Sequence, residues 1–446
     1  MANQPVNGQQ YGPGITRIAV TGFKSLAKKT DVEIRPLTVL AGANSSGKSS
    51  LMQPLLLMKQ TLESDVVPAG PFLLSGPYTR YTETKQFLTS GMDTASIPPS
   101  FSVDFTIDGD LNVGYTYAVK PNNEFDLIQM RTKDSMDQMG WIIDENVKDD
   151  YRNNFIRQKT LGSIGGPVSL FLVRYKYFYR TCVIRGSSDS SFDRQTLDIG
   201  AAIDLNNKIR RILYVPGLRG DQLRKWFLLE VPATNVYEGP FESYVPSIIE
   251  YLQQTDPQKS PSINELNVVL ERLGLASSVR TLRLNESEVE MCVPRTFDSG
   301  DGDYVNVADV GLAVSTVLPV LVALIQAAPG QLVYIEQPEL HLHPRAQWKL
   351  AQLLADAANR DVRLVIETHS SLLLQGILTC VAKGTITPEN VALHWFSRNE
   401  DGVTEVTTAE LDEQGRFGDW PADFDSVEMK ASNDYLDAME GKLMAS

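Results

Sequence analysis

The stretch VLAGANSSGKSS, residues 39–50, decides the fold of this 446-residue chain. Gly42, Gly47, Lys48 and Ser49 in it fill the pattern G-x-x-x-x-G-K-[ST]. Because glycine has no side chain, consecutive backbone N–H groups can close around a phosphate, and a helix that begins at Lys48 points its positive end at the same anion. Lys48 would reach the β- and γ-phosphates of a nucleotide, and the Ser49 hydroxyl would hold Mg²⁺. The stretch therefore predicts a nucleotide-binding site.

The flanking sequence supports this interpretation. The apolar run Leu37–Ala41 predicts a buried strand that leads into the stretch, and LMQPLLLMKQTL after it predicts a helix from Lys48 to about Ser64. A Gly/Ser turn that merely enters a helix is the alternative. The strand before the loop and the apolar helix after it favour the phosphate loop.

Composition indicates more than one lobe. A chain of 446 residues with 42% apolar content exceeds one ordinary domain and can bury a substantial core. Cys182, Cys292 and Cys380 are far apart and show no C-x-x-C spacing, so we expect buried thiols in a reducing cytoplasm rather than disulfides or zinc ligands. The polar start MANQPVNGQQYGPG lacks the basic and apolar regions of a signal peptide.

One uncharged segment has almost the length of a membrane span. Residues 310–330, VGLAVSTVLPVLVALIQAAPG, contain Ser315, Thr316, Pro319 and Gln326 and run directly into another apolar strand. These features favour a helix buried inside a large α/β protein, and no membrane contact is expected.

The net charge of −14 is concentrated at the C-terminal end. Residues 400–446 hold 13 Asp and Glu against three basic residues, so this segment carries −10 of the total. An acidic segment repels phosphate backbones, and the sequence contains no long basic stripe. Direct DNA binding is therefore possible but not favoured.

The hydrophobic pattern divides the chain into five parts. Residues 15–70 form the first part of a nucleotide-binding core, 71–239 a β-rich lobe with a return strand, and 240–278 a helical insertion. Residues 279–390 complete the core, with strands expected at 279–284 and 288–293, and 391–446 form an acidic extension.

Two later strands end in polar residues suited to phosphate chemistry. The apolar run Leu332–Ile335 is followed by Glu336, Gln337 and Glu339, and a carboxylate at the end of a strand can hold Mg²⁺ or its waters. A buried strand with a solvated acidic end is the alternative. A further strand, 362–367, leads to His369, which could contact the γ-phosphate or the attacking water, although a lone histidine is more often structural.

The pair His341 and His343, with Glu339 nearby, superficially suggests a metal cluster. H-x-H after a strand is weak evidence for zinc, and Pro344 follows directly, so a zinc site is not expected.

Four segments in this order resemble a known family: GANSSGKSS, DVGLAVSTVLPVL, VYIEQPELHLHP and ETHS. The order is similar to that in the ABC-type ATPase heads of the RecF, SMC and OLD group. Further segments resemble AAA-family ATPases of bacterial anti-phage defence systems such as Septu, PARIS and retron modules. These segments are FKSL, LLLSGPY, YVPGLR and DGVTEVTTAELDEQGRFGDWP. The resemblance implies an α/β fold, an ABC-ATPase head of the P-loop NTPase class, with an antiparallel β lobe and an inserted helical lobe.

The resemblance also implies a role for each motif. ATP and Mg²⁺ would be the cofactors, with Glu336 as the Walker B acid, Gln337 at the catalytic-glutamate position and His369 as the switch histidine. Gln86 is a candidate for the glutamine that connects the lobes near the metal, beside Ser49 and Glu336. The implied nucleotide contacts are Gly42, Asn44, Gly47, Lys48, Ser49 and Ser50 and, across to a second head, the signature residues Asp309, Gly311 and Ser315.

Three departures from the family pattern predict slow hydrolysis. Gln337 cannot accept a proton, so it would only position water, and either Glu339 or a slower mechanism would take over. A carboxylate at Asp309 would repel a γ-phosphate, so we expect Asp309 to be a helix N-cap instead. Ala313 also replaces a position that is often glycine.

We therefore expect a cytoplasmic ATPase that assembles with itself, as a homodimer or higher homo-oligomer, through ATP held between two heads. Only 77 residues follow His369, too few for a Toprim nuclease, so the implied effector, a nuclease or toxin, would be a separate protein. The alternatives are a RecF-like repair ATPase that binds DNA directly and a nucleotide-locked scaffold with negligible turnover.

Overall fold

A central, mostly parallel sheet organises the computed structural model. The structure describes residues 14–89, 99–122, 124–133, 141–144, 168–186, 192–198, 200–219, 223–255, 262–297 and 303–417. In this part of the chain the central sheet has the strand order β11-β16-β17-β3-β18-β19, and only β19 is antiparallel to its neighbour. Its strands are β3 (Leu37–Gly42), β11 (Leu213–Val215), β16 (Leu332–Glu336), β17 (Arg363–Thr368), β18 (Val391–Arg398) and β19 (Thr404–Ala409).

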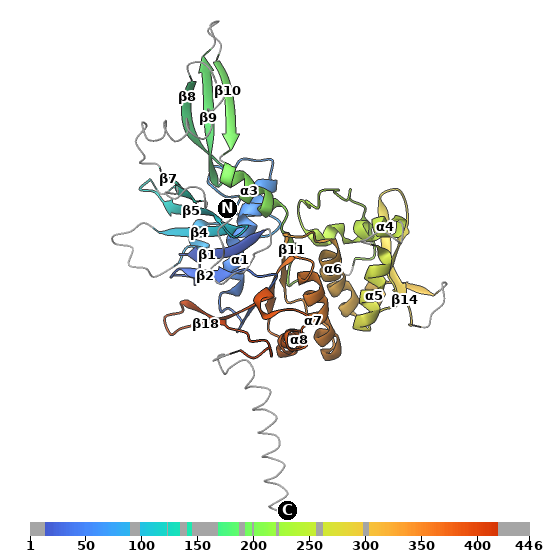
Figure 1. Ribbon diagram of the computed structural model, residues 1–446. Helices are drawn as coiled ribbons and strands as arrows, with labels where there is room; N and C mark the ends of the chain where they lie inside the picture. Colours follow the sequence, from blue (N-terminus) through green and yellow to red (C-terminus); the bar gives the residue numbers. More distant parts are fainter. Residues whose placement is uncertain are drawn as a thin grey trace, which may run out of the picture.

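Both faces of this sheet are covered, as expected for parallel strands. Side chains of a strand alternate between the faces, so Val39 and Ala41 of β3 lie in one apolar core and Leu40 lies in the other. The Leu40 face packs against α1 (Lys48–Glu63) and the β-sheets beyond it, and the Val39 face packs against helices (Figure 1). These helices are α6 (Leu312–Gln326), α7 (Pro344–Ala358) and α8 (Ser371–Ala382).

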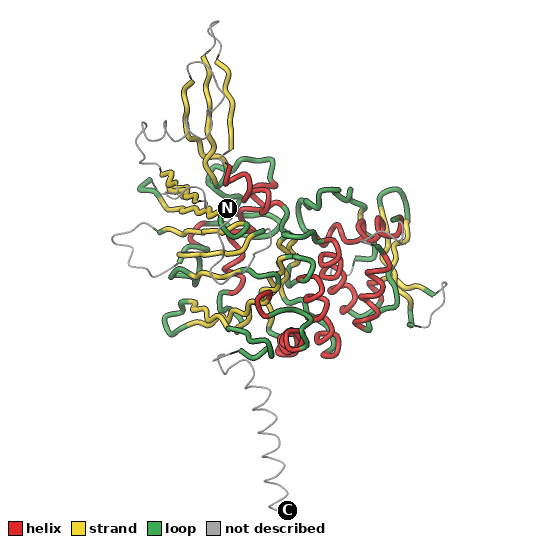
Figure 2. The backbone as a smooth tube through the Cα atoms, viewed as in Figure 1, coloured by secondary structure: helices red, strands yellow, loops and turns green. Residues whose placement is uncertain are grey.

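The β-rich side contains two further antiparallel sheets. The larger has the order β2-β1-β4-β5-β6-β7, from β1 (Ile15–Thr21), β2 (Thr30–Glu33), β4 (Ser100–Ile107), β5 (Leu111–Val119), β6 (Phe125–Lys133) and β7 (Trp141–Asp144). The smaller is a meander of β8 (Val168–Tyr175), β9 (Phe178–Gly186) and β10 (Phe192–Asp198), followed by α3 (Gly200–Arg210). Figure 2 shows the strands of these two sheets on one side of the molecule and a group of helices on the other.

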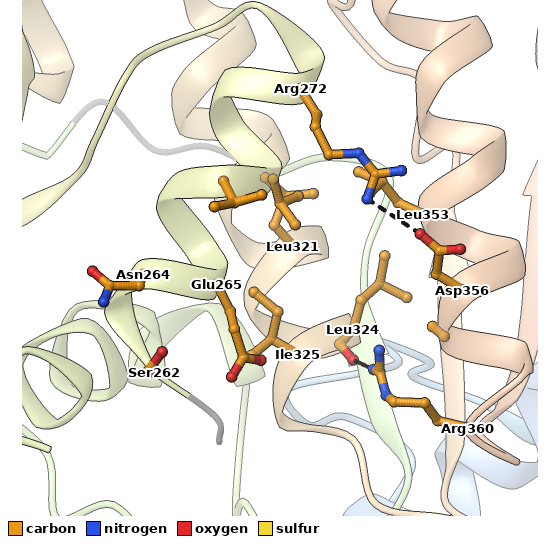
Figure 3. Close-up of a pocket in the computed structure, with 13 residues that line it drawn as sticks. Ser262, Asn264, Glu265, Arg272, Leu321, Leu324, Ile325, Leu353, Asp356 and Arg360 are labelled. Atoms are coloured by element: carbon orange, nitrogen blue, oxygen red, sulfur yellow. Dashed lines mark hydrogen bonds and ion pairs between the residues drawn. The ribbon is translucent and has the colours of Figure 1, made fainter. Parts of the chain in front are cut away.

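The helical side contains the inserted helices α4 (Val245–Gln254) and α5 (Ile263–Leu273), and the short 3₁₀ helix η2 (Phe241–Tyr244) precedes α4. Leu252 of α4 and Leu266 and Leu270 of α5 belong to the same core as α6 and α7. Between α5, α6 and α7 lies a groove of about 420 Å³ with an apolar floor and a charged rim, where Arg272 pairs with Asp356 (Figure 3). None of its lining residues belongs to the predicted nucleotide site.

Strands β13 (Arg280–Arg283) and β14 (Glu288–Pro294) correct one expectation. The sequence predicts both strands, but they do not return to the central sheet. They form a separate antiparallel sheet with β12 (Trp226–Phe227) and β15 (Tyr304–Asn306), packed on α4. The physical reason is the pattern of β14: one face is buried and the other carries Glu288 and Glu290, whereas a central parallel strand would be apolar on both faces.

Other expectations from the sequence are confirmed. The segment at 310–330 forms α6, buried on most of its surface, and no helix in the described residues is long and apolar enough to cross a membrane. Cys292 and Cys380 are free and buried, while the side chain of Cys182 and residues 418–446 lie outside the described part. Because β1 pairs with β4 of the 71–239 segment and β11 of that segment joins the central sheet, the lobes interleave along the chain. The five boundaries stay predictions.

A buried ion pair fixes α1 to the surrounding elements. Lys59 Nζ lies 2.6 Å from Glu63 Oε1, with 2% and 7% of the two side chains exposed. Lys59 also donates to the carbonyls of Arg210 (2.8 Å) and Tyr237 (3.2 Å), and Glu63 accepts from the Tyr78 hydroxyl. The pair therefore joins α1 to the end of α3 and to the segment that leads into the helical side.

We expect Lys59→Ala to lower the free energy of unfolding by about 3 kcal/mol or more, because Glu63 would be left as a buried, uncompensated charge. The matched control is Lys85→Ala, which removes an exposed pair with Glu83 and should cost less than about 1 kcal/mol. Urea unfolding followed by circular dichroism measures both. Equal stability of the two variants would contradict the anchoring role of Lys59.

Candidate nucleotide-binding site

The loop between β3 and α1 has a shape that only glycine permits. Gly42 and Gly47 have φ angles of +142° and +104°. A Cβ at Gly42 would lie 2.1 Å from the Phe396 carbonyl oxygen, and one at Gly47 would lie 2.4 Å from Thr404 Oγ1. Both glycines are therefore required by the backbone conformation and by the close approach of β18 and β19.

The interior of the loop presents polar groups suited to a phosphate. Helix α1 begins at Lys48 without a side-chain cap, so its first N–H groups are available to an anion. The Ser46 hydroxyl is buried and has no hydrogen-bond partner among the described residues. Lys48 Nζ donates to the carbonyls of Gly42 (2.9 Å) and Ala43 (2.8 Å), and burial lowers its pKa. These groups fit a nucleotide phosphate.

The remaining predicted loop residues differ in exposure. Asn44 is exposed, Ser49 is half-buried, and Ser50 is buried in the first turn of α1. Thr404, which the site prediction missed, donates through Oγ1 to the Ser46 carbonyl (2.7 Å), and its hydroxyl also shares a hydrogen bond with Ser25 Oγ (2.8 Å). Thr404 and Ser25 thus contact the 42–50 loop and stabilise its conformation. Their segments, FKSL and DGVTEV, were visible in the sequence, but nothing there indicates that they meet.

Two carboxylates lie side by side at the carboxyl edge of the central sheet. Glu336 ends β16 and is directly opposite Glu367 of β17 in the strand register. The Tyr334 hydroxyl donates to Glu367 and contacts Glu336 Oε1 at 3.1 Å. Glu336 also accepts from the Tyr214 hydroxyl and from the Gly217 N–H, each at 3.0 Å.

Glu367 is the functional candidate that the sequence prediction missed. Its Oε2 accepts a hydrogen bond of 2.8 Å from the Ser49 hydroxyl. Burial and the nearby charge of Glu336 raise the pKa of Glu367 to about 7. The signal was present, because LVIE ends in a carboxylate in the same way as LVYIE does.

Ser49, Glu336 and Glu367 together fit a magnesium ion. A hydroxyl and carboxylate oxygens are the hard donors that Mg²⁺ prefers, usually with one or two carboxylates and several waters. Mg²⁺ bound there would neutralise the phosphate charge of a nucleotide.

Three more predicted residues lie next to the carboxyl edge of the central sheet: Gln337, Glu339 and His369. Gln337 has φ of +45°, and its N–H donates to the Glu367 carbonyl (2.8 Å). Glu339 Oε1 accepts from the Thr368 hydroxyl (2.7 Å) and the His369 N–H (3.1 Å), while its Oε2 is buried without a partner in the described residues. Burial raises the pKa of Glu339, whereas burial and the charge of Lys48 lower the pKa of His369, which bonds to the Gly42 carbonyl.

Arg219 links the turn after β16 to neighbouring segments of the chain. Its guanidinium donates only to backbone carbonyls among the described partners. These are Pro216 (2.8 Å), Thr316 (2.7 Å), Glu336 (2.6 Å) and Gln337 (2.8 Å). Burial lowers its pKa to about 10, so the side chain stays protonated at neutral pH. Arg219 therefore connects the turn after β16 to helix α6.

The expectation that Asp309 caps a helix is wrong. Asp309 ends the 3₁₀ helix η3 (Val307–Asp309), and its carboxylate pairs with Arg224. Gly311 is the residue before α6, and that helix has no side-chain cap. The turn at η3 is stabilised by Asn306 instead, which accepts from the Ala308 N–H. Ser315 lies in the first turn of α6, where its hydroxyl donates to the Leu312 carbonyl (3.0 Å).

The other predicted residues do not join this cluster through any described hydrogen bond. Gln86 is exposed in the 3₁₀ helix η1 (Thr84–Gln86), and its side chain bonds back to Thr82. His343 precedes α7 and caps it by accepting from the Arg345 N–H. The structure thus brings together Gly42, Gly47, Lys48, Ser49, Glu336, Gln337, Glu339 and His369, and leaves Gln86, Asp309, Gly311 and Ser315 outside the hydrogen-bonded cluster.

A parallel sheet that leads into this loop, with acids at the neighbouring strand ends, defines a nucleotide-binding ATPase of the P-loop class. The family model described as "AAA domain, putative AbiEii toxin, Type IV TA system" matches residues 37–159 and 175–375. The chain belongs to this family of ATPases.

Comparisons with other proteins give two further findings. The crystal structure of the SmcHead bound to the C-winged helix domain of ScpA is 12% identical, with 90% of this chain and 99% of that chain covered and a TM-score of 0.45. The SMC head domain from Thermotoga maritima is 10% identical, with 88% and 98% covered and a TM-score of 0.40. No curated protein matches the chain.

We expect Arg219→Lys to lower kcat for ATP about tenfold, because an ammonium has three donors and cannot donate to four carbonyls in three segments of the chain. The nucleotide Kd, set mainly by the 42–50 loop, should change less than about threefold. Steady-state ATPase and fluorescent-ATP titrations measure the two quantities. Arg272→Lys, in an exposed pair with Asp356, is the control and should change neither. A loss of affinity with unchanged kcat would contradict the positioning role.

Proposed function

We propose that this protein binds Mg²⁺-ATP at the 42–50 loop and uses it to hold two copies of the chain together. The observation that carries the proposal is the glycine loop with its open α1 N-terminus and its buried Ser46 hydroxyl, which has no hydrogen-bond partner in the described part of the chain. The ATP of one copy would also contact the α6 N-terminus of the other, at Asp309, Gly311 and Ser315. Three observations support this role for α6: it has no side-chain cap, it has no acidic residue in its first turn, and Arg224 neutralises the nearby Asp309.

The nucleotide-dependent assembly would regulate a separate effector, a nuclease or a toxin, in an anti-phage defence system. The family description, which names a toxin and a type IV toxin–antitoxin system, supports this part of the proposal. The resemblance of the motifs to ATPases of defence modules supports it as well. In this view the two copies change their contacts when ATP binds, and the effector responds to that change.

Hydrolysis would be slow. Gln337 occupies the position where a carboxylate would activate water, and an amide cannot take the proton. Glu339 is the alternative base, since its Oε2 has no partner in the described residues, and His369 would contact the γ-phosphate or the attacking water. Gln337 also favours a second candidate function, a nucleotide-locked scaffold that holds and releases its effector with almost no turnover.

We expect Lys48→Ala to weaken ATP binding at least about a hundredfold, or 2.7 kcal/mol, because the ammonium would no longer reach the β- and γ-phosphates. The same variant should stay in its nucleotide-free assembly state when Mg²⁺-ATP is added, whereas the parent forms a larger species. Fluorescent-ATP titration and sedimentation velocity measure these two properties. Lys383→Ala, an exposed lysine after α8, is the control. Unchanged ATP affinity in Lys48→Ala would remove the proposed site.

We expect Gln337→Glu to hydrolyse ATP at least about tenfold faster than the parent, because a base is restored at a position that the backbone already holds. A single-turnover assay separates this step from product release. Gln337→Ala serves as the control and should not accelerate the reaction. If Gln337→Glu is no faster than the parent, the missing base does not limit hydrolysis, and Glu339 becomes the residue to test.

A further inference from the structure

We propose that Glu367, at the end of β17, is the protein carboxylate that shares the nucleotide's Mg²⁺ with Ser49. This inference rests on the proposed function and assigns a metal ligand within the same site. Sequence motifs assign that role to Glu336. The structure instead places Glu367 Oε2 2.8 Å from Ser49 Oγ, the hydroxyl expected to hold the metal.

The strand order explains why Glu367 is closer. The 42–50 loop follows β3, and β17 is the direct neighbour of β3, with Glu367 opposite Leu40. Strand β16, which ends at Glu336, lies one strand further away, and neighbouring strands are about 4.8 Å apart. The acid on the adjacent strand therefore reaches the first turn of α1, where Ser49 lies.

The distance between the two oxygens suits a shared ion. Mg²⁺ binds six oxygens at about 2.0–2.1 Å in an octahedron, so adjacent ligand oxygens are about 2.8–3.0 Å apart. Ser49 Oγ and Glu367 Oε2 already have this separation. A metal ion could replace the hydrogen bond between them with little movement of either side chain.

Glu336 is less available for the metal. Its Oε1 accepts from Tyr214 and contacts the Tyr334 hydroxyl at 3.1 Å, and its Oε2 accepts from the Gly217 N–H. Glu367 Oε2 accepts only from the Ser49 hydroxyl among the described bonds. Glu336 is therefore a positioning residue that acts on Glu367 through the shared Tyr334 hydroxyl.

The charges around the pair also favour a cation. In the described part of the chain neither Glu336 nor Glu367 forms an ion pair, and Glu367 is 5% exposed. Lys48, whose charge acts on Glu367, directs its Nζ to the carbonyls of Gly42 and Ala43. Glu367 is buried and Glu336 is half-buried, so two adjacent carboxylates without a paired cation are costly, and a divalent ion beside a phosphate would compensate them.

The test measures metal binding rather than turnover. Full-length protein is loaded with a non-hydrolysable ATP analogue, and its affinity for Mn²⁺ is measured by electron paramagnetic resonance. We expect Glu367→Gln to weaken Mn²⁺ binding at least about tenfold, while the affinity for the analogue in EDTA stays within about twofold of the parent. Glu336→Gln should weaken Mn²⁺ binding less than Glu367→Gln does. Glu389→Gln, an exposed carboxylate in the 3₁₀ helix η4 (Pro388–Asn390), is the control and should have no effect.

Mn²⁺ affinity in Glu367→Gln within about twofold of the parent would overturn the inference, and so would a larger loss in Glu336→Gln. Failure of the parent to bind the analogue at all would overturn the proposed function together with this inference. If the parent binds analogue and Mn²⁺ normally and only the Glu367 prediction fails, the proposed function survives.

A second variant keeps the test decisive if Glu367→Gln does not fold. In Glu367→Cys a thiolate, a soft ligand, replaces the hard carboxylate. We expect this variant to lose Mn²⁺ affinity and to gain Cd²⁺ affinity by at least about tenfold relative to the parent in the presence of the analogue. Unchanged preference between Mn²⁺ and Cd²⁺ would show that the side chain at position 367 does not contact the metal.

Discussion

The parallel pairing of β3 with β17 on one side and β18 on the other is the constraint on which the site depends. The register sets Gly42 opposite Phe396 of β18, so the Phe396 carbonyl comes so close that no Cβ fits at position 42. The register on the other side sets Glu367 opposite Leu40 and brings its carboxylate to Ser49. One set of backbone hydrogen bonds therefore fixes both the phosphate loop and the acid beside it.

Several buried cations in this structure donate their hydrogen bonds to backbone carbonyls. Lys48 bonds to two carbonyls of its own loop, Lys176 bonds to the carbonyls of Leu62 and Ser64 at the end of α1, and Arg219 bonds to four. A carbonyl carries partial negative charge and satisfies the donor without burying a second full charge. The consequence is an acidic edge at Glu336 and Glu367 that forms no ion pair with any cation in the described part of the chain. Such an edge is suited to a metal ion that arrives with a nucleotide.

The sequence could predict elements whose signal is local. The run before Gly42, the helix after Gly47 and the acid at the end of β16 each depend on neighbours within a few residues, and all three lie where they were expected. The sequence could not show which of Glu336 and Glu367 lies closer to Ser49. That comparison depends on strand order, which follows from contacts between distant segments. The interpretation of Asp309 failed for the same reason: its partner Arg224 is 85 residues away. Likewise, the bracing of the loop by Thr404 required the position of β19 to be known.

The turn after β16 shows how the two halves of the site could communicate. Gln337 has a left-handed backbone conformation that a residue with a side chain adopts only at a cost, so the surrounding contacts must maintain it. Its N–H bonds to Glu367 and its carbonyl bonds to Arg219, so two backbone contacts, rather than its own side chain, hold the turn. Arg219 also bonds to Thr316 in the second turn of α6. A movement of α6, whose N-terminus is free of a side-chain cap, must therefore either break this bond or displace the turn that carries Gln337. The backbone conformation at position 337 is consequently linked to the position of α6. The absence of a catalytic base at this position depends only on the side chain, which is an amide. A substitution can therefore change the side-chain chemistry at position 337 without changing the link to α6.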